Sequence, residues 1–256
     1  MTGRLLQVEL LTLRYGGVVA LDDVSFGVAG GEVLGLIGPN GAGKTSLIDV
    51  LTGATDPTAG TVVFDGKDVT GLRPHRLARR GLCRTFQSVE LFDDLTVEEN
   101  LMAASEDVTL RSALIDMVLP ARGDRSNVDW ALDACGLSGI AARRPGDLSH
   151  GQRKLVGVAR ALARRPALVL MDEPAAGLDT DESRELGRHL RRLPEQGVTV
   201  FLVDHDMSLV LSVCDRVLVL DFGHLIAEGT PDEIRADQKV IDAYLGAHAE
   251  PGASGG

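Results

Sequence analysis

The chain has 256 residues, 44% of them hydrophobic and 25% charged, a composition that is typical of globular proteins and excludes wholesale disorder. Its formal net charge of -11 argues against a general nucleic-acid binder, which needs a basic surface, so we expect no nucleic-acid partner. The three cysteines lie far apart in no metal-ligand spacing, and no apolar run is long enough to span a bilayer.

The first thirty residues alternate between apolar and polar side chains, which predicts half-buried strands. Leu6, Val8 and Leu10 form the first alternating set, and Val24, Phe26 and Val28 form the second. We therefore expect each set to lie on one buried face of an antiparallel flank.

Three later apolar runs are continuous, at residues 33–37, 167–171 and 198–203. Such runs are typical of parallel strands that are covered on both faces. Helical patterns at 44–53 and 182–193 lie between them. The pattern indicates an α/β core.

Residues 88–148 read as a helical lobe, because Thr96 and Glu99 have capping-box spacing and no buried strand follows until residue 167. Residues 217–229 predict a hairpin, followed by short helices. The expected organisation is one domain over 1–248, with its core in 1–87 and 149–248, and a disordered tail at 249–256.

GPNGAGKT at 38–45 matches the phosphate-loop pattern and has the required buried strand before it and helix after it. Its glycines allow successive backbone N–H groups to face phosphate oxygens, Lys44 adds a positive charge, and Thr45 supplies a hydroxyl for Mg²⁺. The expected nucleotide-binding residues here are Gly38, Pro39, Asn40, Gly41, Ala42, Gly43, Lys44, Thr45 and Ser46.

Three further side chains are candidates for the chemistry at this loop. Asp172 and Glu173 follow a buried strand, so Asp172 is expected to hold Mg²⁺ and Glu173 to polarise the attacking water, unless the pair only caps a helix. His205 ends another buried strand and is expected to touch the γ-phosphate or the water, with an ordinary surface histidine as the alternative. Gln87 is a weaker candidate for Mg²⁺ and water, because glutamine at a strand end is commonplace.

LSHGQ at 148–152 opens a second amphipathic helix that offers an anion its first amides and its dipole. Ser149 is the expected N-cap, and the alternative is an ordinary capped helix. One nucleotide cannot readily be enclosed by both helix starts of one chain if the second lies on a separate lobe. A second copy facing the first head to tail resolves this geometry.

The ordered set of GPNGAGKT, Gln87, LSHGQ, LVLMDEP, AGLD and VDHD resembles the ATP-binding subunits of ATP-binding cassette (ABC) transporters over residues 5–246. The resemblance implies a P-loop NTPase core with a mostly parallel sheet, an antiparallel flank and a helical lobe. It also implies ATP hydrolysis with Mg²⁺, and two subunits that enclose two ATP molecules.

The resemblance assigns further roles. Ser149, Gly151 and Gln152 would complete the partner's nucleotide site. Tyr15 would stack on adenine, with a core tyrosine as the alternative, and Asp179 would lie at the dimer contact, with a helix cap as the alternative. His150 stands where the common signature has its first glycine, and a pH-sensitive contact there is a hypothesis.

Several stretches, including RTFQSVELFDDLTVEENL and the closing EGTPDEIRADQKVIDAYLG, are similar to subunits of bacterial branched-chain amino acid importers. This implies a cytoplasmic ATPase, peripheral on the inner face of the membrane. Its partners would be transmembrane permeases, an identical or sister ATPase and, indirectly, a solute-binding protein. Alternatives are a motor for urea, amides, aromatic acids or lipid export, and a non-transport ABC ATPase.

Overall fold

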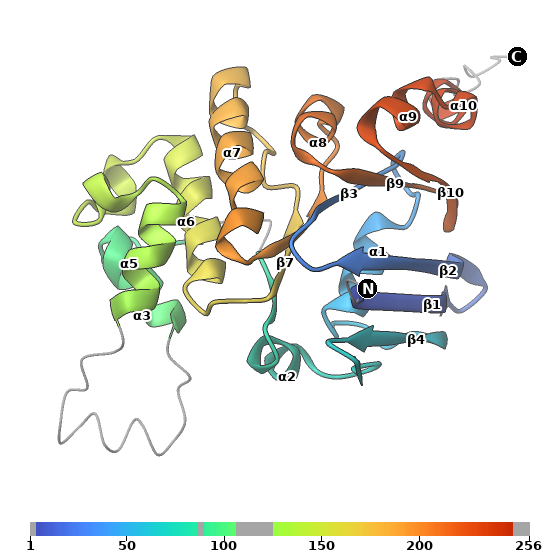
Figure 1. Cartoon of the computed structure of the whole chain (residues 1–256), viewed down its shortest axis with the longest axis horizontal. Coiled ribbons are helices and arrows are strands. Elements are labelled where there is room, and N and C mark those ends of the chain that lie inside the picture. The colour runs from blue at the N-terminus through green and yellow to red at the C-terminus, as the bar shows by residue number, and fades with distance from the viewer. Residues whose placement is uncertain (1–3, 86–89, 106–124, 248–256) are drawn as a thin grey trace, which may run out of the picture.

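The structure is a computed structural model that describes residues 4–85, 90–105 and 125–247 (Figure 1). A four-stranded antiparallel sheet has the order β2–β1–β4–β5 and consists of β1 (Arg4–Tyr15), β2 (Val18–Ala29), β4 (Ala59–Phe64) and β5 (Lys67–Asp68). A six-stranded sheet has the order β10–β9–β3–β8–β7–β6 and consists of β3 (Val33–Ile37), β6 (Leu82–Arg84), β7 (Leu168–Asp172), β8 (Thr199–Val203), β9 (Arg216–Asp221) and β10 (His224–Gly229). Only β10 runs antiparallel to its neighbour in the larger sheet.

Helices cover both faces of the larger sheet. The helices in the described residues are α1 (Lys44–Leu51), α2 (Pro74–Arg79), α3 (Val97–Ser105), α5 (Arg125–Ala134), α6 (His150–Leu162), α7 (Thr180–Arg192), α8 (Met207–Val213), α9 (Pro231–Ala236) and α10 (Gln238–Ala247), with short 3₁₀ turns at Ser138–Ile140, Pro145–Asp147 and Pro194–Gln196. Helices α3, α5 and α6 pack on one another at one end of the molecule, and the antiparallel sheet lies at the other (Figure 1).

Two hydrophobic cores explain the continuous apolar runs. One core packs Leu36, Leu170 and Phe201 with α1 and the antiparallel sheet. The other packs neighbouring residues of the same strands, such as Met171 and Leu202, with α6, α7 and α8. Because successive strand residues point to opposite faces, a strand covered on both sides needs apolar residues throughout.

One expected alternation is wrong. Leu6 and Val8 are buried, but the Leu10 side chain is 62% exposed. The pairing of β1 with β2 shifts between Val8 and Leu11, and Leu10 has φ 48°, so a β-bulge turns Leu10 outward and places Leu11 in the core. Alternation alone did not reveal the extra residue.

The predicted capping of α3 is confirmed: the Thr96 N–H donates to the Glu99 carboxylate at 2.8 Å, and the Glu99 N–H donates to the Thr96 hydroxyl at 3.2 Å. The hairpin of β9 and β10 and the helices after it also form where the sequence predicts them. The predicted lobe is described only at 90–105 and 125–148, and the predicted tail lies outside the described residues.

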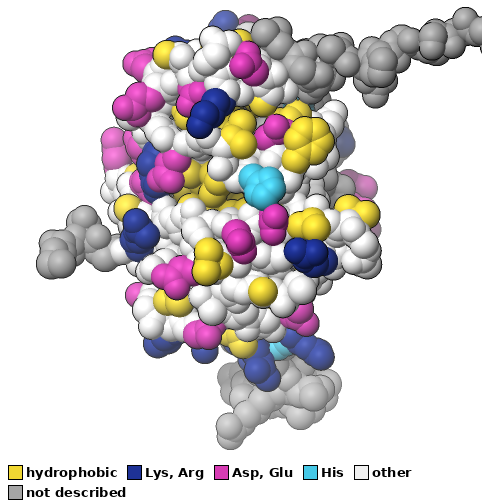
Figure 2. All heavy atoms as spheres, turned by 90° about the vertical axis from the view of Figure 1, so that its right-hand side faces the viewer, with side chains coloured by type: hydrophobic (Ala, Val, Ile, Leu, Met, Phe, Trp, Pro, Cys, Tyr) yellow, Lys and Arg dark blue, Asp and Glu magenta, His cyan; other side chains and the backbone are white. Residues whose placement is uncertain are grey.

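Figure 2 shows the face that carries the tip of the antiparallel sheet and the β9–β10 hairpin. On the described part of this face, lysine and arginine side chains are interspersed with acidic ones, and hydrophobic side chains gather in its upper half. Within the described ranges, no helix is both long and apolar enough to cross a membrane.

The contact between the two sheets gives a stability prediction. Phe201 on β8 is fully buried and its ring stacks on Phe26 of β2, with centroids 5.9 Å apart. We expect Phe201→Ala to lower the free energy of unfolding by about 3–5 kcal/mol, because it leaves a cavity between the sheets. Urea denaturation measures this loss. The matched control Phe222→Ala removes a ring that is 83% exposed and should change stability by less than about 0.5 kcal/mol. Equal losses would contradict the description of the core.

Candidate functional site

The register of three parallel strands aligns the ends that carry the candidate residues. Leu36 of β3 pairs with Val203 of β8, and Val203 pairs with Asp172 of β7. The chain segments that follow these residues therefore leave the sheet at one edge. This is the carboxyl edge, where ligands of open α/β sheets bind.

The phosphate loop lies between β3 and α1 and depends on glycine. Gly41 and Gly43 have φ 81° and 106°, in the left-handed region. A Cβ at Gly38 would lie 2.1 Å from the Leu220 carbonyl oxygen, and one at Gly43 would lie 2.5 Å from the Ala20 carbonyl oxygen. The loop is thus pressed against β9 and β2, which forces its backbone into a tight curl.

Lys44 closes the loop from inside. Its Nζ donates to the carbonyl oxygens of Gly38 and Pro39 at 2.7 and 2.9 Å. Burial lowers the pKa of Lys44, while the carboxylates of Glu173 and Asp172 raise it in opposition. The ammonium group is therefore held in the loop and attracted toward the end of β7, where an incoming phosphate would replace the loop carbonyls as its partner.

Arg84 holds the carboxylate at the end of β7. Its Nη2 lies 2.8 Å from Asp172 Oδ2, and its Nη1 lies 2.7 Å from Oδ1 of Asp49 on α1. Burial raises the pKa of Asp172, and the hydrogen bond and charge of Arg84 act against that rise. The sequence reasoning did not identify Arg84, because its partners are 35 and 88 residues away.

Glu173 and His205 lie beside each other, as the sequence predicts from their strand ends. Glu173 has φ 48° and its N–H donates to the Val203 carbonyl oxygen at 2.7 Å. His205 Nδ1 lies 3.9 Å from Glu173 Oε1 and 3.5 Å from Asp204 Oδ1. The His205 side chain is 62% exposed, so most of the imidazole is accessible to solvent.

Asp204 is a functional-site residue that the sequence reasoning missed. It is almost fully buried, and its two carboxylate oxygens accept the N–H groups of Ala175 and Asp206 at 3.1 and 2.9 Å. Burial raises its pKa, although both hydrogen bonds and nearby His205 lower it. Asp204 therefore ties the segment after β7 to the segment after β8 and sets the position of His205.

The second helix start is built as predicted. Ser149 caps α6: its hydroxyl accepts the Gln152 N–H at 3.2 Å, and the Gln152 side chain accepts the Ser149 N–H at 3.1 Å. His150 lies in the first turn, with Nε2 3.1 Å from the position of a Cβ at Gly177. The signature thus contacts the AGLD segment at 176–179.

The remaining candidates lie on different elements. Tyr15 ends β1 and is half exposed, as a stacking side chain must be. Asp179 caps α7, accepting the N–H groups of Asp181 and Glu182 at 2.9 Å each, which is the alternative that the sequence left open. Its place at a dimer contact stays a prediction. Gln87 lies outside the described residues.

The donor set at the loop fits Mg²⁺ bound together with a nucleotide. Among the residues that the structure describes, no group of three or more His, Cys, Asp and Glu forms a metal cage. Mg²⁺ is commonly held by one or two protein oxygens together with substrate phosphates and waters. Thr45 in the first turn of α1 and Asp172 at the end of β7 supply this kind of oxygen.

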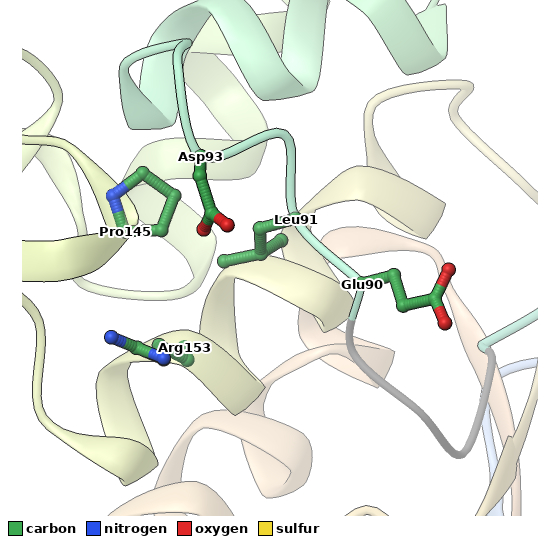
Figure 3. A pocket seen from close by; sticks show the side chains of 5 residues that line it. All are labelled: Glu90, Leu91, Asp93, Pro145 and Arg153. Carbon is green, nitrogen blue, oxygen red and sulfur yellow. The ribbon is translucent and has the colours of Figure 1, made fainter.

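A pocket of about 400 Å³ lies away from the phosphate loop (Figure 3). Glu90, Leu91 and Asp93 come from the segment before α3, Arg153 comes from α6, and Pro145 comes from the turn before α6. Arg160 of α6 fixes the segment before α3, because its Nη1 donates to the Glu90 carbonyl oxygen at 2.7 Å. The pocket is therefore an open hollow between α6 and residues 90–93.

The Arg84 contacts give a pH prediction. We expect Arg84→Met to lower the free energy of unfolding by about 2 kcal/mol at pH 7, because it leaves buried Asp172 without its cation. The pKa of Asp172 is raised in the folded state, so its protonation favours folding at low pH. The deficit should therefore shrink as the pH falls from about 7 toward 4, in urea denaturation at both ends.

The matched control is Arg184→Met, which removes an exposed ion pair with Asp181. This pair should contribute less than about 1 kcal/mol, with little dependence on pH in this range. A deficit of Arg84→Met that is the same at both pH values would show that Arg84 does not balance a buried carboxylate.

Comparison with known proteins places these features in a family. The family model described as ABC transporter matches residues 21–176, and the model described as branched-chain amino acid ATP-binding cassette transporter matches residues 224–250. The chain is 39% identical to the high-affinity branched-chain amino acid transport ATP-binding protein BraF of Pseudomonas aeruginosa, over 96% of this chain and 99% of that protein. The Escherichia coli K12 protein LivG, which has the same description, is 38% identical over the same shares.

Another relative has a different cargo in its description. The lipopolysaccharide export system ATP-binding protein of Escherichia coli K12 is 37% identical over 94% of this chain and 97% of that protein. Among solved structures, an ATP-binding cassette of an ABC transporter in its ADP conformation is 34% identical, with a TM-score of 0.83 over 96% of this chain and all of that one. A nucleotide-free cassette is 32% identical, with a TM-score of 0.82 over 94% of this chain and 99% of that one.

The phosphate loop, the acidic end of β7, the capped signature helix and the full-length similarity thus agree. The chain belongs to the ATP-binding subunits of the ABC transporter family and is an ATPase.

Proposed function

We propose that this ATPase drives the import of branched-chain amino acids through transmembrane permeases. The observation that carries the proposal is similarity along the whole chain to two transport proteins for these solutes, together with the separate match of residues 224–250 to a model of that branch. The solute does not bind this subunit. Urea, short amides and aromatic acids are therefore alternative cargoes for the same motor.

Lipid export is a second candidate function. It is favoured by the 37% identity to the lipopolysaccharide export protein, which is close to the 39% identity to the amino acid transport protein. The match of the C-terminal residues favours import.

The phosphate loop binds ATP in this proposal. The backbone N–H groups of residues 40–46 surround the β- and γ-phosphates, and Lys44 moves from the loop carbonyls to the phosphate oxygens. Tyr15 stacks on the adenine. Thr45, Asp172 and Gln87 would hold Mg²⁺, which would supply positive charge to neutralise the phosphate oxygens.

Two residues act on the attacking water. Glu173 accepts its proton or orients it, and His205, 3.9 Å from the Glu173 carboxylate, contacts the water or the γ-phosphate. Asp204 keeps His205 at this position through its own buried hydrogen bonds. The exposure of His205 leaves the site open on the side from which a partner subunit would close it.

A second subunit completes each site. Ser149, Gly151 and Gln152 begin α6, whose first amides and dipole suit a phosphate. They act on the nucleotide of the partner, which is either an identical copy or a sister ATPase. Asp179 and the AGLD segment lie at the contact between the two subunits.

Permeases dock at the pocket between α6 and residues 90–93. The pocket is open, and it lies near Gln87 in the sequence and near the signature helix in space. A permease segment in this pocket contacts α6, which carries the signature, and residues 90–93, which follow Gln87 in the chain. The complex then sits at the inner face of the membrane, and a solute-binding protein acts on the permeases from outside.

The proposed role of Glu173 predicts that a variant without its carboxylate stays in an ATP-bound pair of subunits. We expect Glu173→Gln to lower the rate of ATP hydrolysis at least about a hundredfold, because the amide cannot accept the proton of the water. ATP binding should be retained, so the variant should accumulate as an ATP-bound pair in analytical ultracentrifugation. The control Glu185→Gln changes an exposed glutamate on α7 and should behave like the parental chain. Parental turnover by Glu173→Gln would remove Glu173 from the mechanism.

The proposed docking of permeases at the pocket predicts which proteins purify together with this chain. The tagged chain, purified gently from native membranes, should bring with it two permeases, a second ATPase and a solute-binding protein, identified by mass spectrometry.

Asp93→Arg should lose most of the permeases in the same purification, because the larger cation fills the pocket, while the ATPase rate of the isolated subunit stays parental. Asp94→Arg makes the same charge change next to the pocket lining and should retain the permeases. Recovery of lipid-export components would instead favour the second candidate function.

A further inference from the structure

A side chain of the same subunit occupies the start of the signature helix. Glu182, in the first turn of α7, places Oε1 3.1 Å from the Ser149 hydroxyl and 2.9 Å from the Gly151 amide nitrogen. Both groups donate to this one carboxylate oxygen. A charged acceptor at the positive end of α6 forms stronger hydrogen bonds than a neutral one.

The contact is close and is fixed from both ends. A Cβ at Gly151 would lie 3.0 Å from the Cγ, Cδ and Oε1 atoms of Glu182, so the carboxylate packs directly on the glycine. At the other end, the Asp179 side chain accepts the Glu182 N–H at 2.9 Å, which anchors the residue to the AGLD segment. The carboxylate therefore reaches α6 from a constrained backbone.

The donors held by Glu182 are the ones that the proposed function assigns to the partner's nucleotide. The Gly151 N–H and the Ser149 hydroxyl proton cannot serve a carboxylate and a terminal phosphate at the same time. Two anions within a few ångströms also repel each other strongly where water is excluded. The carboxylate must leave α6 before the phosphate arrives.

We propose that Glu182 is an intramolecular competitor for the terminal phosphate of the partner's ATP, and that its carboxylate holds the signature donors in the separated subunit. This inference rests on the proposed pairing of two subunits around ATP. The free energy needed to release Glu182 lowers the affinity of the two subunits for each other. It also limits pairing to subunits that present a complete triphosphate.

The test measures pairing directly. Both variants are made in the Glu173→Gln background, so that ATP persists, and the protein concentration for half-maximal pairing with ATP is determined by analytical ultracentrifugation. We expect Glu182→Gln to lower this concentration roughly tenfold, because a neutral amide competes less well and two such contacts are released per pair. Glu185→Gln, one turn further along α7 and exposed, should leave it unchanged.

Two further measurements separate the outcomes. ATP affinity of the dilute single subunit should be the same in all forms, and the urea midpoint checks that Glu182→Gln is folded. Pairing of Glu182→Gln that is equal to or weaker than that of Glu185→Gln would overturn the competitor role and leave the proposed function standing. If every form binds ATP and none pairs at any concentration, the ATP-driven pairing of identical copies fails, and the competitor role in such a pair fails with it.

Discussion

The alignment of three parallel strands is the constraint on which the site depends. Leu36, Val203 and Asp172 lie side by side on neighbouring strands. The phosphate loop, the buried Asp204 and Glu173 follow these strands and therefore lie at the same edge of the sheet. This register is fixed by two hydrophobic cores, because a slip of one residue would exchange the faces of every strand side chain. The packing of the two hydrophobic cores therefore sets the positions of the residues at the carboxyl edge of the sheet.

Several charged groups at this edge have protein partners before any nucleotide arrives. Asp49 and Asp172 share Arg84, and Lys44 rests on the carbonyls of its own loop within reach of the Glu173 charge. At the start of α6, a carboxylate occupies the donors in the same way. Protein groups therefore occupy Lys44 and the Ser149 and Gly151 donors in the separated subunit. At these groups, binding a phosphate exchanges one partner for another.

The sequence predicted the features that depend on local pattern. Continuous apolar runs gave the parallel strands, and the spacing of Thr96 with Glu99 and the position of Ser149 gave two capped helices. Leu10 was misassigned because a bulge changes the alternation without a glycine or proline to signal it. Arg84, Asp204 and Glu182 were missed because their roles come from partners that only the fold brings near.

In the proposed function, ATP hydrolysis at this edge drives the uptake of branched-chain amino acids. The decisive measurement is the uptake of labelled leucine, isoleucine and valine by cells of the source organism in which the gene for this chain is deleted. We expect high-affinity uptake to be lost, to return with the parental chain, and not to return with Lys44→Ala, whose loop cannot hold the phosphates. If uptake of all three amino acids is unchanged in the deleted cells, this chain does not drive their import.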